Sequence, residues 1–106
     1  MNNIRLAPFV GKRLVFTALV VGFATRKLDN SEELETILIR NILCEGERLA
    51  RHHWLDSEPM WRNLNLKAGF VVSFSALVKE YERSDGTKSF GLSNPLDAKV
   101  IDTPHG

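Results

Sequence analysis

Cysteine is nearly absent from this chain of 106 residues, since Cys44 is the single one. One thiol excludes an internal disulfide and a zinc site built from several thiolates. A chain without disulfides is typical of a reducing compartment, so we expect a cytoplasmic setting.

The chain also has little net charge. Its 14 Lys and Arg residues are balanced by 13 Asp and Glu residues, which leaves a net charge of +1. This balance excludes a basic footprint over the whole molecule, as in histone tails, but it permits a local basic patch. The apolar share of 43% and the charged share of 25% are ordinary globular values, and the length suits one domain rather than two.

No apolar run is long enough to span a bilayer, which needs about 20 residues. The longest run covers residues 14–24 and follows Lys12 and Arg13, as in a secretory signal. Its Val, Phe and Thr residues favour instead a strand buried on both faces. We interpret the run as a strand, and a signal sequence in the native host remains an alternative.

Alternating apolar and polar residues predict a mainly β chain. The clearest strand covers residues 70–83, where one face is apolar and is predicted to form the core. That face consists of Phe70, Val72, Phe74, Ala76 and Val78. The other strands are predicted over residues 13–27, 36–43, 47–56 and 88–92, with an interruption near Asn94-Pro95 and a short closing strand over 98–101.

A short helix is predicted over residues 58–64, between the third and fourth strands. Ser57 can cap it, Glu58 suits its positive end, and Pro59 is tolerated at an early helical position. Trp61 lies on this helix and is expected to close one end of the core.

This order of elements resembles the OB-fold, a five-stranded barrel with a short helix between strands 3 and 4. The local match is best over residues 64–78, where Lys67 and Gly69 precede the alternating strand. The resemblance covers residues 12–101, with residues 1–11 as an N-terminal arm and 102–106 as a C-terminal tail. The chain is similar to small stand-alone OB proteins of bacteria and their mobile elements, many of them uncharacterised, in which a His and a Trp stand in strand 3.

Catalysis and metal binding are not expected, and no cofactor is implied. His52 and His53 are adjacent in a predicted strand, so their side chains should point to opposite faces and cannot easily share one ion. Cys44 has no base partner nearby in the sequence, and no glycine-rich phosphate loop is present.

The resemblance implies a ligand on strands 2 and 3 and on the loops after strands 1 and 4. Binding of a single strand needs stacking rings beside positive charge, and such residues occur in these regions. The candidates are Arg48, His52 and Trp54 in the third strand, and Lys79, Tyr81, Arg83, Lys88 and Phe90 in the last hairpin. We therefore expect a non-catalytic protein that binds single-stranded nucleic acid, DNA rather than RNA.

Several alternatives stay open. Four acidic residues between Asp29 and Glu35 lie in the first loop, and carboxylates repel phosphate. This loop favours a protein–protein interaction module in a larger complex. Trp54 could equally be a core residue at the end of the barrel, and a secreted domain that binds sugar or peptide would require the signal sequence.

Overall fold

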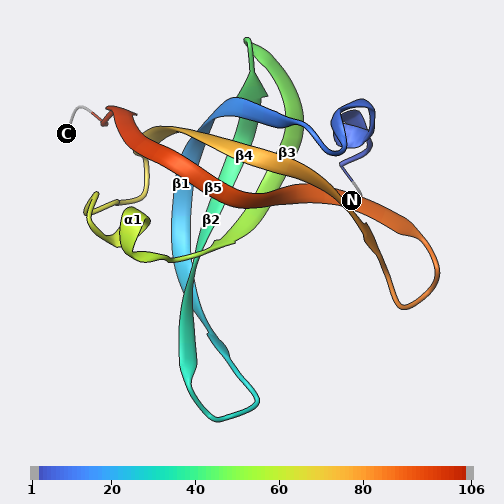
Figure 1. The fold of residues 1–106 in the computed structure, drawn as a ribbon. Coiled ribbons are helices and arrows are strands. Elements are labelled where there is room, and N and C mark those ends of the chain that lie inside the picture. Colours follow the sequence, from blue (N-terminus) through green and yellow to red (C-terminus); the bar gives the residue numbers. More distant parts are fainter. Residues whose placement is uncertain (1–2, 105–106) are drawn as a thin grey trace.

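Five antiparallel strands form one sheet in the computed structural model, which describes residues 3–104 (Figure 1). The chain is therefore mainly β, as predicted. The strands are β1 (Arg13–Lys27), β2 (Glu33–Cys44), β3 (Glu47–Asp56), β4 (Val71–Glu82) and β5 (Lys88–Asp102). Their order in the sheet is β3-β2-β1-β4-β5.

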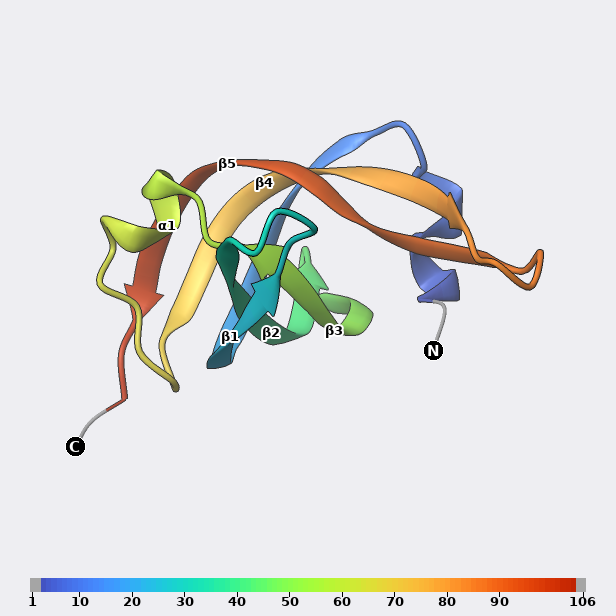
Figure 2. The ribbon, with the colours of Figure 1, turned by 90° about the horizontal axis from the view of Figure 1, so that it is seen from below.

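The central strand β1 pairs with two neighbours along different parts of its length. Residues 13–19 pair with β4, and residues 17–27 pair with β2. Its register with β2 shifts between Thr17 and Leu19 and between Val20 and Gly22, which marks two irregularities in this pairing. β4 and β5 form a curved layer above β2, β3 and the second part of β1 (Figure 2).

The apolar run over residues 14–24 lies within β1, as the strand interpretation predicted. Phe16, Ala18 and Val20 point from it into the core, each at most 2% exposed. Among residues 3–104, no helix is long and apolar enough to cross a membrane.

The predicted barrel is not closed. Within the described part of the chain, no strand pairing joins β3 to β5, which are the two ends of the sheet order. A 3-10 helix, η1 (Ile4–Phe9), contacts both strands instead. Asn3 Nδ2 donates to the Phe90 carbonyl of β5 at 3.2 Å, and Arg5 Nη1 donates to a carbonyl of β3 at 3.2 Å. Leu6 is fully buried, so from residue 3 onward the N-terminal arm is part of the packed fold.

The alternating face of β4 forms the centre of the core, as predicted. Val72, Phe74, Ala76 and Val78 are each at most 1% exposed, and Phe70 packs against them while partly buried. The period of two in the sequence therefore identified these positions correctly.

The helix α1 (Pro59–Arg62) is shorter than predicted, and Ser57 does not cap it. The N-cap residue is Glu58, without a side-chain cap, while the buried Ser57 donates its backbone N–H to the Glu35 carbonyl at 2.8 Å. Trp61 closes the core from this helix as expected. It is 1% exposed, and its ring packs edge-on against that of Phe74 at 5.4 Å between centroids.

Strand β5 is continuous over the segment where an interruption was predicted. Asn94 and Asp97 adopt left-handed backbone conformations, with φ of 49° and 56°, and the register with β4 shifts twice beside them. Pro95, which lacks an N–H, lies between these irregularities. The sequence signal therefore marked a bend in one strand rather than a break between two.

We expect Phe74→Ala to lower the free energy of unfolding by about 3–5 kcal/mol, because it empties a large core site. Val15→Ala is the matched control, since Val15 is 64% exposed on β1 and should cost less than about 1 kcal/mol. Urea denaturation followed by circular dichroism measures both. Equal losses in the two variants would contradict the core assignment.

Candidate nucleic-acid interface

One face of the β1–β2–β3 layer carries polar and aromatic side chains in neighbouring rows. Arg40 of β2 pairs with His52 of β3, and Leu38 pairs with Trp54. Side chains two residues apart share a face of a strand, so these four lie on one face. Arg40 and His52 are exposed. The fold thus brings the predicted candidates His52 and Trp54 together and adds Arg40 beside them.

Trp54 borders a pocket of about 330 Å³ near the base of the β1–β2 hairpin. The pocket is lined by Ala24, Arg26, Thr36, Trp54 and Asp56. Trp54 is 49% exposed, so it is not a core residue at the end of a barrel. Gly22, opposite Leu38, has no heavy atom within 4 Å of the position of an added Cβ, which leaves the face open beside the ring.

Polar groups in this pocket offer both donors and acceptors. Arg26 Nη2 lies 3.4 Å from Asp56 Oδ1, and both side chains are more than half exposed, so this ion pair contributes little stability. Thr36 Oγ1 donates to the Ala24 carbonyl at 3.1 Å, and its lone pairs can still accept. A flat ligand ring could therefore stack on Trp54 in this pocket. The polar groups of the pocket could then contact the polar edge of the ligand ring.

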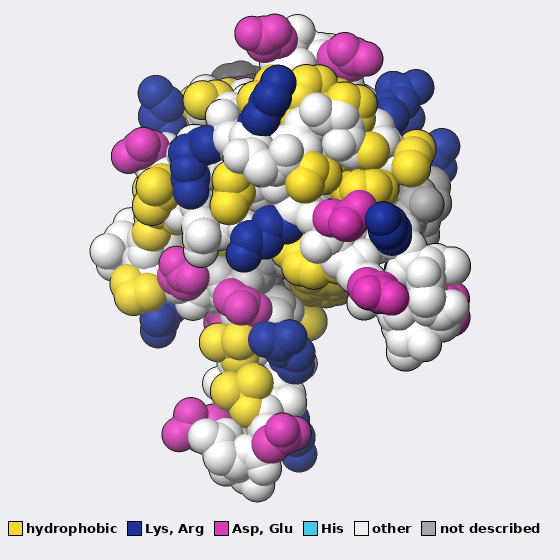
Figure 3. All heavy atoms as spheres, turned by 45° about the vertical axis from the view of Figure 1, so that its right-hand side comes forward, with side chains coloured by type: hydrophobic (Ala, Val, Ile, Leu, Met, Phe, Trp, Pro, Cys, Tyr) yellow, Lys and Arg dark blue, Asp and Glu magenta, His cyan; other side chains and the backbone are white. Residues whose placement is uncertain are grey.

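The remaining candidates in the last hairpin lie on a second projection. The β1–β2 and β4–β5 hairpins both extend from the body of the molecule, with a recess between them (Figures 1 and 3). Lys79 and Tyr81 are on β4, Lys88 is on β5, and Arg83 follows β4. Lys88 Nζ lies 3.6 Å from Glu80 Oε1, and Arg83 Nη2 donates to Ser89 Oγ at 3.5 Å.

Phe90 and Arg48 do not join the Trp54 pocket. Phe90 is 8% exposed and belongs to the core, so its ring does not present a face for stacking. Arg48 lies near the start of β3, opposite Leu43, and borders a different pocket beside η1. The structure therefore divides the predicted candidates among four places: the Trp54 face, the last hairpin, the pocket beside η1 and the core.

The rings of Tyr81 and His53 both contact the backbone of β5 at Gly91. A Cβ at Gly91 would lie 2.8 Å from Tyr81 Cε2 and 3.0 Å from His53 Cε1, so only glycine leaves room for both rings. His53 also forms a hydrogen bond with the Leu92 backbone. His53 thus links β3 to β5 although the two strands do not pair.

Burial lowers the pKa of His53 below its usual value of 6.5, since the core disfavours the charged imidazolium. The neighbouring His52 lowers this pKa further, whereas the Leu92 hydrogen bond and Asp56 act in the opposite direction. His53 faces the core and His52 faces solvent, which confirms that the two side chains point to opposite sides of the strand.

Metal and thiol chemistry have no assembled site in the described residues. No group of His, Cys, Asp and Glu side chains within residues 3–104 could hold a metal ion, and His105 lies outside that range. Burial and the acidic neighbours Glu45 and Glu47 raise the pKa of the Cys44 thiol, which keeps it protonated at neutral pH. A protonated thiol is a poor nucleophile.

Sequence reasoning missed Arg40 and Asp56 as members of this face. Arg40 was visible on the polar side of its predicted strand, but placing it beside His52 requires the register between β2 and β3. That register runs without a shift from the Thr36–Asp56 pair to the Ile42–Ala50 pair. The alternation within each strand predicts the faces of that strand, but it does not predict which residues of the other strand lie opposite.

We expect stability to fall as pH decreases through the range below the unfolded pKa of His53. The unfolded chain takes up a proton near pH 6.5, whereas folded His53 resists it, so the stabilisation present above this pH is lost on acidification. Urea midpoints at about pH 7.5 and about pH 5 should differ less in His53→Gln than in the wild type. His52→Gln is the matched control: it removes only the smaller contribution of the neighbouring imidazole to the His53 pKa and leaves His53 buried, so it should keep most of the wild-type difference. An unchanged pH dependence in His53→Gln would show that His53 is not responsible.

No family model, curated protein or solved structure matches this chain. The residues around Trp54 are therefore interpreted from their own geometry and chemistry.

Proposed function

We propose that this protein binds single-stranded nucleic acid, DNA rather than RNA, on the β1–β2–β3 face and without catalysis. The observation that carries the proposal is the half-exposed Trp54 ring in an open pocket, with Arg26, Arg40 and His52 on the same face. Base stacking on an exposed aromatic ring, together with nearby positive charge, is how proteins bind single strands with little sequence preference.

The topology supports an OB-type interpretation of this face. The order β3-β2-β1-β4-β5, with α1 between β3 and β4, is that of an OB barrel opened between β3 and β5. In OB-folds the face of strands 2 and 3 takes oligonucleotides, flanked by the two hairpin loops. The Trp54 pocket occupies the corresponding position, and Lys79 and Tyr81 would flank the ligand from the second hairpin.

The acidic β1–β2 loop is less unfavourable than its sequence suggests. Thr36 borders the pocket, and Glu32 lies four residues away along the hairpin, which corresponds to roughly 13 Å at ~3.3 Å per residue. Glu33 and Glu35 are closer along the chain but lie on the opposite face of β2 from Thr36. Figure 3 shows acidic side chains at the far end of that projection. The Debye length is about 10 Å at 0.1 M salt, so repulsion from the tip is largely screened at the pocket.

The carboxylate within the pocket would contact the base. Asp56 accepts hydrogen bonds, and the exocyclic amino group of cytosine donates them. A base stacked on Trp54 would bring its edge towards Asp56, while Arg26 offsets the negative charge at 3.4 Å. This arrangement favours a base with an amino group over thymine.

A protein-interaction module is the second candidate function. The β1–β2 hairpin carries exposed apolar side chains, with Phe23 at 44% and Leu28 at 37%, next to its acidic residues. A partner protein with a basic, partly apolar surface would suit this hairpin, whereas a nucleic acid would not.

We expect the wild type to bind a labelled single-stranded DNA of about 12 nucleotides at low salt, a length within the range that one OB-fold covers. Trp54→Ala should weaken binding about 5- to 150-fold, because one stacked base contributes roughly 1–3 kcal/mol. Trp54→Phe should retain part of the affinity. Fluorescence anisotropy measures the dissociation constants, and an RNA of the same sequence tests the preference for DNA.

Phe23→Ala provides the matched control for an exposed ring. Phe23 pairs with the buried Ile37, so it lies on the other face of the sheet, and its removal should leave DNA affinity unchanged. Arg40→Ala should flatten the slope of log affinity against log salt by about 0.7 for one lost phosphate contact. Absence of binding at hundreds of micromolar protein would favour the interaction module, and full affinity in Trp54→Ala would exclude this face.

A further inference from the structure

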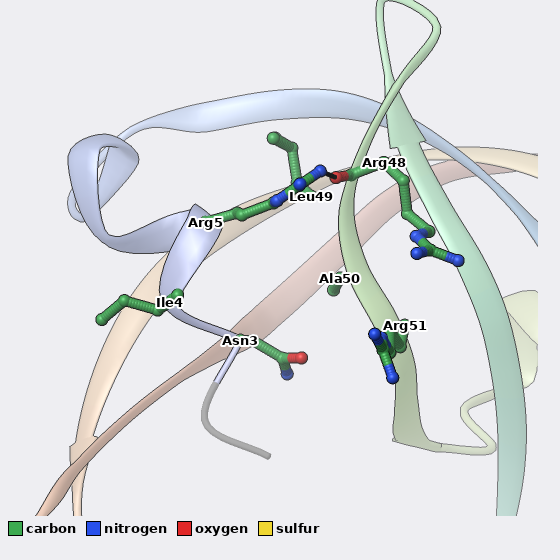
Figure 4. Close-up of a pocket in the computed structure, with 7 residues that line it drawn as sticks. All are labelled: Asn3, Ile4, Arg5, Arg48, Leu49, Ala50 and Arg51. Carbon is green, nitrogen blue, oxygen red and sulfur yellow. Dashed lines mark hydrogen bonds between the residues drawn. The ribbon is translucent and has the colours of Figure 1, made fainter.

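A second pocket, of about 200 Å³, lies between η1 and the first half of β3 (Figure 4). Its apolar floor contains Leu49 and Ala50, each 5% exposed. Asn3 and Arg5 border it from the N-terminal side, and Arg51 borders it from β3. No acidic side chain lines this pocket, in contrast to the Trp54 pocket with its Asp56.

Two guanidinium groups reach this pocket from different elements. Figure 4 shows Arg5 extending from η1 to β3, where its Nη1 donates to the Arg48 carbonyl at 3.2 Å. The Asn3 amide extends towards the side of β3 that carries Arg51, whereas the Ile4 side chain points away from β3. The Arg48 guanidinium lies on the far side of β3, over β2, so Arg48 contributes its backbone here.

These two positive charges have no acidic partner in the described chain. The ion pairs Arg26–Asp56 and Lys88–Glu80 involve neither Arg5 nor Arg51. One hydrogen bond to the Arg48 carbonyl fixes the position of the Arg5 guanidinium group. The other N–H groups of this guanidinium remain free to donate. The pocket therefore has donors of Arg5 that this bond positions, and positive charge from Arg5 and Arg51 with no acidic lining residue beside it, and both features favour an anion.

We propose that this pocket is a phosphate-binding site in which Arg5 and Arg51 hold one phosphate group from opposite sides. A guanidinium fork matches two oxygens of a phosphate, and the remaining oxygens can accept from a second fork. A planar carboxylate has only two oxygens, and one guanidinium group can bind both of them. The volume is below the ~300–1,000 Å³ of sites for drug-sized ligands, which suits a group of a few atoms.

The bound phosphate would connect η1 to β3 and so hold the N-terminal segment against the sheet. This site shares no residue with the Trp54 pocket, so it does not depend on the proposed binding of bases. The phosphate could belong to free phosphate or a nucleotide, or to the end of a nucleic-acid strand, and these sources share the same recognition chemistry.

The test is a titration of the full-length protein with inorganic phosphate, followed by calorimetry. We expect saturable binding of one phosphate, and a loss of affinity of about tenfold or more in each of Arg5→Ala and Arg51→Ala. Arg51→Lys should lose part of the affinity, because it keeps the charge but not the fork. Arg62→Ala, which removes an exposed arginine of α1, is the matched control and should bind as the wild type does.

A second measurement separates this site from the Trp54 face. Phosphate should raise the urea midpoint of the wild type and of Trp54→Ala equally, and should not raise that of Arg51→Ala. Tighter binding of a 5′-phosphorylated oligonucleotide than of its 5′-hydroxyl form, lost in Arg51→Ala, would identify a strand end as the source. Equal binding of both forms would assign the site to free phosphate or a nucleotide. Lack of saturable phosphate binding, or an equal loss in Arg62→Ala, would overturn the proposal.

Discussion

The double pairing of β1 is the constraint on which the rest of the structure depends. One strand of 15 residues serves β4 with its first half and β2 with its second half, and the two partners overlap only over residues 17–19. The buried residues of β1 are Phe16, Ala18 and Val20, which lie on one face in and beside the segment where the pairing passes from β4 to β2. Residues 23–27 are exposed and belong to the projecting hairpin, so β1 joins both partner strands to one interior through its first eight residues.

The double pairing of β1 also determines how the sheet ends. It leaves β3 and β5 as the two ends of the sheet order, and no ladder joins them in the described residues. An unpaired strand edge exposes backbone groups that invite association, so folded proteins cover or interrupt such edges. Here η1 covers part of the boundary with the fully buried Leu6, and His53 bridges another part to Gly91 and Leu92. The contact of the His53 side chain with β5 takes the place of a strand–strand contact at this boundary. This contact offsets the cost of burying the imidazole.

The sequence allowed the regular parts of this fold to be predicted and not the irregular ones. The period-two pattern around Phe74 placed the core face of β4 correctly, because only one face of a strand with this pattern is apolar and suited to burial. The docking of η1 was not predictable, because one buried side chain, Leu6, gives no period. Left-handed residues such as Asn94 and Asp97 lie beside shifts of the register, and local composition does not show which strand neighbour then lies opposite.

The same limit applied to the candidate site. His52 and Trp54 were recognisable as a pair two residues apart on one strand, so their shared face followed from strand geometry. Phe90 looked equivalent in the sequence but is 8% exposed, because it lies two residues before the buried Leu92 and shares the core-facing side of β5 with it. Arg5 and Arg51 carried no signal at all, since they approach the same pocket from segments that are distant in the sequence.

The near-zero net charge conceals an uneven distribution that gives β3 two different chemical environments. Acidic residues lie in the β1–β2 loop, at Asp56 near the end of β3, and at Glu45 and Glu47 where β3 begins, whereas the charged residues that line the pocket beside η1 are all arginines. Arg51 and Trp54 are three residues apart, which is roughly 10 Å along a strand. That separation exceeds or equals the Debye length at ordinary salt, so the two pockets act as nearly independent electrostatic sites. The Trp54 pocket offers a ring for stacking and a polar acceptor in Asp56, whereas the pocket beside η1 offers guanidinium groups without an acidic partner. A ligand that carries both a flat ring and a phosphate could use both environments, because each pocket offers what the other lacks.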